Sequence, residues 1–469
     1  MTDITQKVLS EYGGSVVASG PGVQIRDVSR VQSTATDRVV RQAVFGDEAE
    51  REAARWVLWE LGQATGVRPA SIHDLYLARG GGQCGGFTVP AMNVRMLAYD
   101  TARAIFRAAL RSQAGAIILE IARSEIAYTD QRPAEYVCVM LAAALREGYA
   151  LPLFIQGDHC QVNAKKYAAD SDGEIGEVKK LIAEEVAAGF YNVDVDTSTL
   201  VDLSHSTLDA QQGANYERAA EITAFIRDLE PDEVTVSVGA EIGEVGQKNS
   251  TVEELHAFMA GYRRSLAGLG DHAGISKISV QTGTTHGGVV LPDGSIAEVK
   301  LDLQALEALS KAAREYGLAG AVQHGASTLP PNAFGNFPRI ETAEIHLATN
   351  FQNIVFDHPL MPADLRSRIV AWLESNAQGE RKAGDTVEQF FYRARKRAIG
   401  PFKRELWDLP ESVRSAMAAD LEKTFDFLFE QLRVTGTDDL VRRFIAAPVQ
   451  HHATLARVGA AEDDAEAGE

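Results

Sequence analysis

The chain has 469 residues, of which 45% are hydrophobic and 24% are charged, and its formal net charge is −19. This composition is typical of an ordinary soluble globular protein, with enough residues for one large domain plus additions. The acidic balance argues against nucleic acid as a main partner, because binding to a phosphate backbone needs a dominant basic surface.

The first segment, residues 1–84, is predicted to be an N-terminal extension with helical character. Its start, MTDITQKVLSEYGG, has no basic segment followed by an apolar run, so it does not read as a signal peptide. Apolar residues recur at helical spacing within 46–66 and predict an amphipathic helix there. The glycine-dense stretch 79–86 (RGGGQCGG) then reads as a loop or hinge before the next segment.

Residues 85–357 show a different pattern, in which short apolar runs of strand type alternate with longer helical stretches. The runs are 87–94, 115–122, 151–158, 191–196, 233–241, 276–283, 320–324 and 343–349, with helical stretches such as 177–189, 214–229 and 303–317 between them. Eight strands with alternating helices predict a (β/α)8 TIM barrel within the α/β class. A doubly wound open sheet is the alternative, but no GxGxxG follows an early strand.

The alternation stops after the barrel segment. Residues 358–455 read as a C-terminal helical region, and 456–469 as an acidic disordered tail. No apolar stretch approaches the ~20 residues of a membrane span, so no membrane partner is expected. The three cysteines, Cys84, Cys138 and Cys160, form no CxxC pair and indicate neither a disulfide framework nor a thiolate zinc site. A cytoplasmic protein is therefore predicted.

Candidate functional residues follow from the barrel, because its active site lies at the C-terminal ends of the strands. The polar residues at these ends are Asp158, His159, Asp196, Glu241, His286, His324, His346 and Thr349. One such histidine alone is more often a hydrogen-bonded core residue. Three that reach one face, His159, His286 and His324, suit a catalytic zinc that keeps a position open for substrate. Asp196 and Glu241 offer oxygen ligands for a second or displaced metal position.

Glycines follow two of these histidines and let backbone N–H groups approach an anionic ligand closely; they are Gly287 and Gly325.

Seven segments occur in this order over about residues 85–360: FTVPAMNV, GDHC, AGFYNVDVDTS, GAEIGEVG, TGTTHGG, QHGAS and HLATN. Together they resemble the class II (metal-dependent) fructose-bisphosphate aldolases and their tagatose-bisphosphate relatives, the ketose-bisphosphate aldolase family. LEIARSEIAYT and GDHCQVN also look like the accessory, non-catalytic subunit of tagatose-bisphosphate aldolase.

The resemblance implies a lyase that cleaves a phosphorylated ketose, by default fructose 1,6-bisphosphate, to dihydroxyacetone phosphate and an aldehyde through a zinc-stabilised enediolate. It implies His159, His286 and His324 as zinc ligands, Asp158 as the acid/base, and Asp196 and Glu241 as second-site metal ligands. Expected substrate contacts are Gly287, Gly325, Ser327 and Thr349 around a phosphate, with His346 and Asn93 beside them. Members are usually homodimers or larger assemblies, and they often bind a monovalent cation near that phosphate. Asn93 could equally cap a turn.

The sequence also departs from the family pattern. Asn249 stands where the family has a glutamate that exchanges the proton on the enediolate carbon, and His346 stands where it has an asparagine. Two other functions therefore remain open: a non-catalytic barrel subunit of an aldolase complex, and a metal-dependent sugar isomerase or epimerase. The basic run 392–405 is either a solvated or subunit-contact face or the source of an arginine for a substrate phosphate; Arg123 is a second candidate for that contact.

Overall fold

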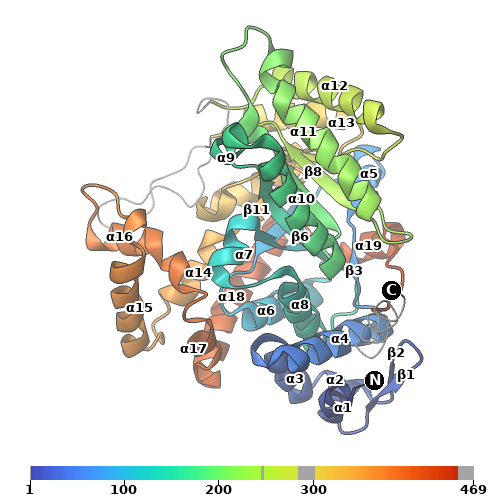
Figure 1. The fold of residues 1–469 in the computed structure, drawn as a ribbon, viewed down its shortest axis with the longest axis vertical. Coiled ribbons are helices and arrows are strands. Elements are labelled where there is room, and N and C mark those ends of the chain that lie inside the picture. Colours follow the sequence, from blue (N-terminus) through green and yellow to red (C-terminus); the bar gives the residue numbers. More distant parts are fainter. Residues whose placement is uncertain (1, 244–247, 284–300, 453–469) are drawn as a thin grey trace, which may run out of the picture.

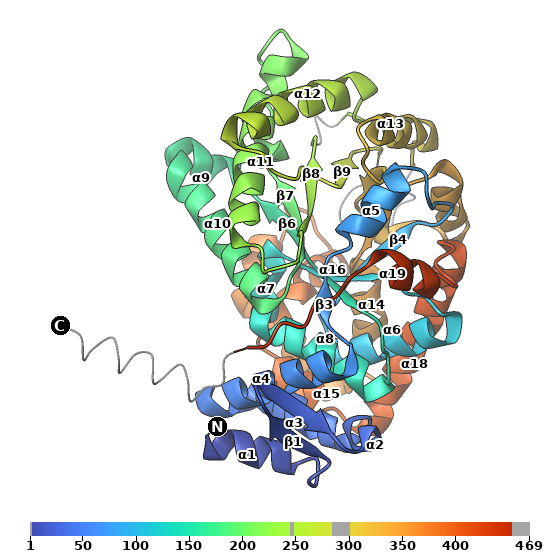
Figure 2. The same cartoon turned by 90° about the vertical axis from the view of Figure 1, so that its right-hand side faces the viewer.

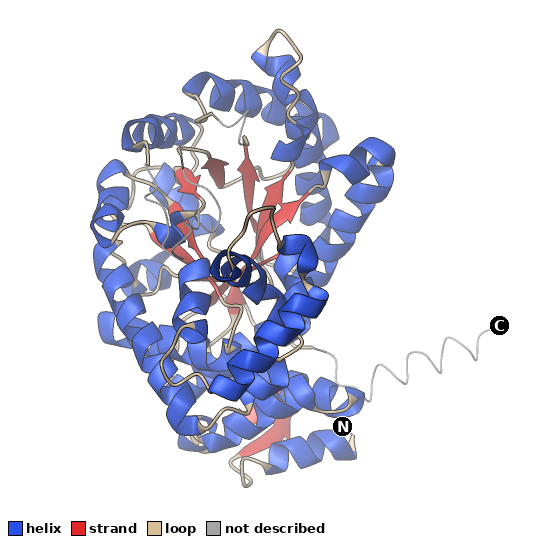
Figure 3. Ribbon diagram, turned by 90° about the vertical axis from the view of Figure 1, so that its left-hand side faces the viewer, coloured by secondary structure: helices blue, strands red, loops and turns tan. Residues whose placement is uncertain are grey.

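The computed structural model of the protein describes residues 2–243, 248–283 and 301–452, and a parallel barrel forms its centre (Figure 3). The strands are β4 (Val89–Asn93), β5 (Ile118–Ala122), β6 (Leu153–Gln161), β7 (Asn192–Asp196), β8 (Ser237–Glu241), β9 (Lys277–Val280), β10 (Ala321–Gln323) and β11 (Glu344–Leu347). Each strand pairs in parallel with the next, and β6 pairs with both β5 and β7, which closes the barrel. The predicted (β/α)8 fold and all eight predicted strands are confirmed.

Helices surround the barrel and cover its outer face. They are α6 (Ala98–Ser112), α7 (Arg123–Thr129), α8 (Pro133–Glu147), α9 (Ala164–Ala169), α10 (Ser171–Ala188), η1 (Ser198–Leu200), α11 (Leu208–Leu229), α12 (Val252–Leu269), α13 (Leu303–Glu315), η3 (Ala326–Thr328), η4 (Pro331–Ile340) and α14 (Thr349–Phe356). Local sequence signals set their ends: a capping box of Thr251 and Glu254 begins α12, and Gly189 ends α10 in the left-handed conformation. The strands are buried on both faces, as a parallel sheet requires.

Residues 2–65 of the N-terminal segment form a layer below the barrel, whereas residues 73–80 lie beside the barrel (Figure 1). The elements of the segment are α1 (Asp3–Ser10), β1 (Val16–Ser19), β2 (Gly22–Ile25), α2 (Val28–Val31), α3 (Thr34–Phe45), α4 (Glu48–Thr65), β3 (Pro69–Ala70) and α5 (His73–Gly80). Helix α4 matches the predicted amphipathic helix, and α3 and α4 pack on α8. The hairpin β1–β2 was not predicted. Strand β3 pairs with the start of β6, so this segment is joined to the barrel sheet itself.

The C-terminal region is helical, as predicted, up to Phe444. It consists of α15 (Ala363–Asn376), η5 (Gln378–Glu380), α16 (Val387–Ala394), η6 (Arg395–Ala398), α17 (Lys403–Trp407), α18 (Glu411–Gln431) and α19 (Asp438–Phe444). Helix α18 packs on α6, and η6 packs on α7 near the barrel mouth.

After α19 the chain runs without a helix back to α4 (Figure 2). There Trp59 Nε1 donates to the carbonyl of Gln450 at 2.6 Å, and its ring stacks on His452 with 3.9 Å between centroids. The predicted tail 456–469 lies outside the described residues, and the predicted domain limits stay predictions. No helix in the described ranges is long and apolar enough to cross a membrane.

Candidate active site

The end of β6 carries Asp158 and His159 on neighbouring positions, which an ordinary strand would direct to opposite faces. The pairing of β6 with β7 shifts register between Gly157 and Cys160, and His159 has a φ of +44°. This bulge lets both side chains reach the barrel mouth. A non-glycine residue in the left-handed region costs roughly 1–3 kcal/mol, and such local strain is concentrated at functional sites.

A candidate metal site lies at this end of the barrel. His159, Glu241 and His324 place one ligand atom each within 4.8 Å of one another, and the rings of His159 and His324 lie 4.2 Å apart. Asp196 joins them, because its Oδ2 is 3.2 Å from His159 Nδ1. Four of the predicted ligands therefore come together. The fifth, His286, and the predicted phosphate contact Gly287 lie outside the described residues.

The charges around these ligands fit a divalent cation. Burial raises the pKa of Glu241 to about 8, and repulsion from Asp196 adds to that rise. Burial opposes the charged form of His159, but Asp158, Asp196 and Glu241 outweigh it and raise its pKa well above the ordinary value. Without a metal, the raised pKa values of Glu241 and His159 favour protonation of these two groups, which offsets the negative charge of the carboxylates. A divalent cation bound by two imidazoles and a carboxylate would replace those protons, since metal ligands bind in their deprotonated forms.

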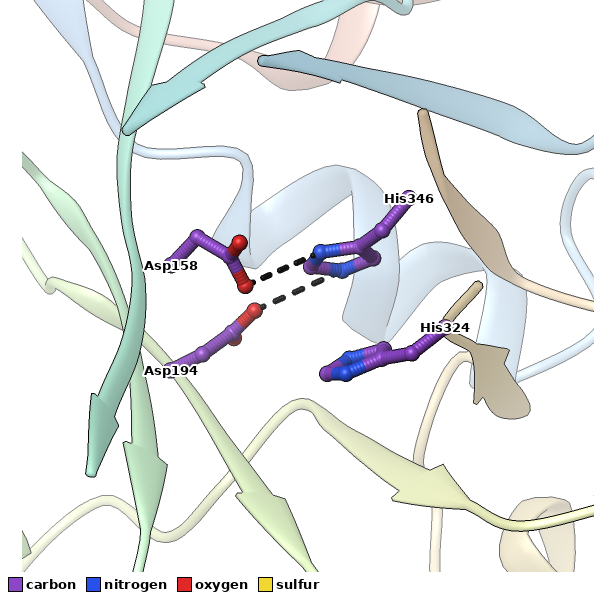
Figure 4. A group of neighbouring side chains, drawn as sticks. All are labelled: Asp158, Asp194, His324 and His346. Atoms are coloured by element: carbon purple, nitrogen blue, oxygen red, sulfur yellow. Dashed lines mark hydrogen bonds and ion pairs between the residues drawn. The ribbon is translucent and has the colours of Figure 1, made fainter. Parts of the chain in front are cut away.

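A second group, Asp158, Asp194, His324 and His346, is equally compact but is already neutralised by ion pairs (Figure 4). The ring of His346 has Nδ1 3.1 Å from Asp158 Oδ1 and Nε2 3.5 Å from Asp194 Oδ2. The ammonium of Lys277 lies 2.9 Å from Asp194 Oδ1. Within the described residues, a lysine neutralises Asp194, whereas no lysine or arginine is paired with Asp196 or Glu241, so the geometry favours the His159 group as the metal site.

A cavity of about 800 Å³ opens above the metal site, at the C-terminal ends of the strands. Asp158, His159, His324 and His346 line it. Its lining also contains six basic residues, which are Arg95, Arg123, Lys166, Lys382, Arg393 and Lys396. Lys382, Arg393 and Lys396 come from the C-terminal helical region, which therefore completes the cavity wall.

Some of the residues predicted to contact substrate line this cavity, and one, Asn93, does not. Gly325, Ser327, Thr349 and His346 line the cavity, and their contact with a substrate stays a prediction. Asn93 is not part of the lining. Its Nδ2 donates to Glu125 at 2.5 Å, and its Oδ1 accepts from Arg95 Nε at 3.0 Å. A substrate contact by Asn93 stays a prediction.

The sequence analysis missed the charged residues deeper in the barrel, which are Glu120, Asp194, Lys277 and Glu344. All four are buried on strands. A signal was present, because Asp194 stands two residues before Asp196 and Glu344 two before His346, which places each pair on one strand face. Asn249, at the loop position where the family has a glutamate, makes a hydrogen bond in which its Nδ2 donates to Asp302 Oδ2 at 3.0 Å.

Comparison with known proteins agrees with this fold. The sequence pattern of the family "Fructose-bisphosphate aldolase class-II" matches residues 82–405. The chain therefore belongs to the class II fructose-bisphosphate aldolase family, whose members use a divalent metal and act on phosphorylated sugars. No sequence among the curated proteins matches the chain.

Solved structures of low identity are similar to the chain, and two of them, with TM-scores of 0.50 and 0.52, share its fold. A probable tagatose 6 phosphate kinase from Sinorhizobium meliloti 1021 has a TM-score of 0.52 at 16% identity, covering 76% of this chain and 99% of that one. The fructuronate-tagaturonate epimerase UxaE from Cohnella laeviribosi has a TM-score of 0.50 at 12% identity, covering 93% and 90%. A fructose-bisphosphate aldolase from Campylobacter jejuni has a TM-score of 0.47 at 17% identity, covering 79% and 98%. At these identities the likeness is one of fold.

Proposed function

We propose that the protein is a zinc-dependent aldolase that cleaves a phosphorylated ketose, by default fructose 1,6-bisphosphate, to dihydroxyacetone phosphate and an aldehyde. The observation that carries this proposal is the convergence of ligand atoms from His159, Glu241 and His324, of which the two histidines line one cavity together with Asp158. The predicted ligand His286 completes the proposed set. A bound cation would supply Lewis-acid stabilisation of the negative charge that develops on the ketone fragment.

Asp158 is the proposed acid/base. Its carboxylate lines the cavity and lies 3.8 Å from the ring of His159, so a substrate held at the metal site meets it directly. In cleavage, Asp158 accepts the proton of the hydroxyl on the carbon that becomes the aldehyde. The electron pair of the broken carbon–carbon bond stays on the ketone fragment. Asn249 has no ionisable proton for the later exchange step, and its amide is bonded to Asp302.

The phosphorylated substrate is supported by the shape and charge of the cavity. Gly325 has a φ of +69°, a conformation that exposes backbone to a ligand, and Ser327 and Thr349 stand beside it. We propose that these residues, with Gly287, bind one phosphate. A monovalent cation near that phosphate, and a homodimer or larger assembly, belong to the same proposal.

Lys396 is the proposed partner of a second anionic group on the substrate. The three arginines of the cavity wall are already paired: Arg95 with Glu125, Arg123 with Glu174 and Arg393 with Asp385. Of the three lysines, Lys166 and Lys382 are exposed to solvent. Lys396 is half-buried, and within the described ranges no hydrogen bond or ion pair engages its ammonium group. Burial lowers its pKa, so an anion that bound there would regain the lost stabilisation.

A kinetic experiment tests this role. Lys396→Met is expected to raise KM for a bisphosphorylated ketose at least 10-fold while kcat falls much less, because the contact contributes to binding in the ground and transition states alike. The control is Lys423→Met, which changes an exposed lysine paired with Asp420 and is expected to leave KM unchanged. An unchanged KM in Lys396→Met contradicts the proposed contact.

The function itself is tested with a panel of phosphorylated ketoses, with triose phosphate as the product measured, in the presence and absence of a chelator. We expect cleavage that the chelator abolishes and zinc restores. His324→Ala should lose both bound zinc and cleavage. Asp158→Ala should keep zinc but lose about 100-fold or more in turnover, the usual scale for a missing acid/base. Cleavage at the normal rate by Asp158→Ala would refute the proposed role.

A sugar epimerase or isomerase is the second candidate. It is supported by Asn249 at the loop position and by the fold likeness to an epimerase over 93% of this chain. Both reactions use the same enediolate chemistry, but only the aldolase reaction breaks a carbon–carbon bond. Product analysis separates them: a triose phosphate supports the aldolase, whereas a rearranged sugar of the same length supports the second candidate. A third possibility, a barrel subunit without activity, predicts neither product.

A further inference from the structure

A layer of buried charged and polar side chains lies inside the barrel, and two of its members, Glu120 and His346, also line the cavity. Its members come from five strands and are Glu120 (β5), Gln156 (β6), Asp194 (β7), Lys277 (β9), Glu344 and His346 (β11). Charged groups this deep are costly unless each has hydrogen-bond partners. Their contacts therefore indicate what the layer is built to support.

Glu344 is the most heavily bonded member of the layer. One of its oxygens, Oε1, accepts from Lys277 Nζ at 2.5 Å, from Gln156 Nε2 at 3.0 Å and from His346 Nε2 at 2.8 Å. The other, Oε2, accepts from the hydroxyl of Tyr76. With both oxygens occupied, this carboxylate has one orientation. It presents a fixed acceptor to the imidazole of His346.

Glu344 holds the ring of His346 at Nε2, and the other ring nitrogen, Nδ1, faces Asp158 and Glu120. Nδ1 lies 3.1 Å from Asp158 Oδ1 and 3.1 Å from Glu120 Oε2, as Figure 4 shows for Asp158. Carboxylate oxygens accept hydrogen bonds, so a protonated Nδ1 donates to this acidic pair, in which Asp158 and Glu120 lie at equal distances. Both ring nitrogens of His346 thus face acidic side chains, and one of these acids is the proposed acid/base.

We propose that His346 is a positioning residue that holds the Asp158 carboxylate in place, and that Tyr76 acts on the same carboxylate through Glu344 and His346. The inference rests on the proposed function, because Asp158 is the acid/base only there. It gives the N-terminal segment a part in the site: Tyr76 belongs to α5, before the barrel begins, and it is fully buried. It also differs from the contact with substrate expected for His346 at the sequence level.

Loss of the contact between His346 and Asp158 should lower kcat and leave substrate binding nearly unchanged. A carboxylate displaced by about 1 Å from its productive position loses on the order of 100-fold in rate, although the substrate still binds. Partners that orient a group at a reaction centre typically contribute 10–100-fold. Removal of the Nδ1 contact should therefore lower kcat on that scale and change KM by less than about 3-fold.

Two substitutions of His346 separate its two contacts. Asparagine places an amide near the Nδ1 position and keeps a donor for Asp158, whereas glutamine places it near Nε2 and keeps a donor for Glu344. We expect His346→Gln to lower kcat about 10–100-fold and His346→Asn to recover most of that loss. Equal losses in the two variants, or a loss confined to KM, overturn the proposal.

A double-mutant cycle tests whether His346 acts through Asp158. In an Asp158→Asn background, His346→Gln should cause no further loss of kcat, because the group it positions is already absent. Additive losses in the double variant overturn the proposal. Zinc content should be unchanged in His346→Gln; loss of zinc would place His346 among the metal ligands and also overturn it.

Tyr76→Phe tests the contact that lies farthest from Asp158 in the series Tyr76, Glu344, His346 and Asp158. It does not disturb packing, since only a hydroxyl is lost. A several-fold fall in kcat with an unchanged KM is expected. The control is Tyr262→Phe, which removes an equally buried hydroxyl that bonds Thr223 at 3.1 Å, away from the site. A fall of the same size in the control, or none in Tyr76→Phe, contradicts the role of Tyr76.

A measurement independent of activity separates this inference from the proposed function. In protein labelled with ¹⁵N-histidine, the His346 ring signals are identified by their absence in His346→Gln, and the Nδ1–H signal should shift on Asp158→Asn. If that shift occurs and no ketose is cleaved, the proposed function fails but the contact stands. If cleavage occurs and the shift does not, the positioning role fails alone.

Discussion

Replacement of Lys277 by methionine should lower the free energy of unfolding by about 3–5 kcal/mol, the usual cost of removing one partner from a buried ion pair. The lysine side chain is 0% exposed, and its ammonium lies 2.9 Å from Asp194 Oδ1, 2.5 Å from Glu344 Oε1 and 2.7 Å from Gln156 Oε1. Methionine is similar in length and volume, so the change creates little cavity. What is lost is the charge that compensates two buried carboxylates.

The pKa of Glu344 reflects that charge. Burial works to raise this pKa, but Lys277 and His346 outweigh it and bring it from an ordinary 4.5 to about 2. The direction of this shift shows that the native protein stabilises the charged form of Glu344 despite its burial. The charge of Lys277 is the largest single cause that favours the ionised form. Loss of the lysine should therefore remove a large part of this stabilisation and leave Asp194 poorly compensated as well.

The assay is urea denaturation at pH 7 followed by far-UV circular dichroism, with a chelator in every sample so that bound metal does not add stability. The control is Lys179→Met, whose pair with Glu221 is 25% and 31% exposed and should contribute less than about 1 kcal/mol. Lys277→Met with Glu344→Gln should recover part of the loss, because the orphaned carboxylate is gone. A Lys277→Met protein within about 1 kcal/mol of the parent would refute the reasoning.

Two further predictions concern stability. Burial and Arg227 lower the pKa of His73 to about 4, so between pH 6.5 and 4 the unfolded chain binds a proton at this residue and the native protein does not. The free energy of unfolding should therefore fall by about 3 kcal/mol as the pH drops from 6.5 to 4. The variant His73→Phe should lack this loss in the same urea experiment. Gly157→Ala would place a methyl group 2.4 Å from Glu185 Oε2, which should lower the free energy of unfolding by about 1–3 kcal/mol and reduce turnover through the adjacent Asp158. Its control is Gly176→Ala on α10, where nothing lies within 4 Å and a gain of about 0.5–1 kcal/mol is expected; a destabilised control would contradict the steric explanation.

Much of the barrel could be predicted because its signals are local. Apolar runs marked each strand, and a polar residue at the end of a run marked the barrel mouth. His159, Glu241 and His324 were found in this way, and their ligand atoms do converge. The hairpin β1–β2 was missed because its strands are short and only partly buried, so they lack the strong apolar pattern of the barrel strands.

The layer inside the barrel depended on information that is not local. Asp158 and His159 face the same cavity only because β6 carries a bulge, and the sequence does not reveal its register. Tyr76 and Glu344 are 268 positions apart in the chain and meet only once the barrel has closed. A lysine such as Lys277 near the start of a strand reads as a surface residue until its neighbours in the barrel are known.

The position of the metal tests the central claim most directly. In a crystal of the zinc-reconstituted protein, anomalous scattering at the zinc edge should give one strong peak about 2.0–2.1 Å from a ring nitrogen of both His159 and His324. A peak bound to neither ring, or no peak in protein that cleaves a phosphorylated ketose, would contradict the account.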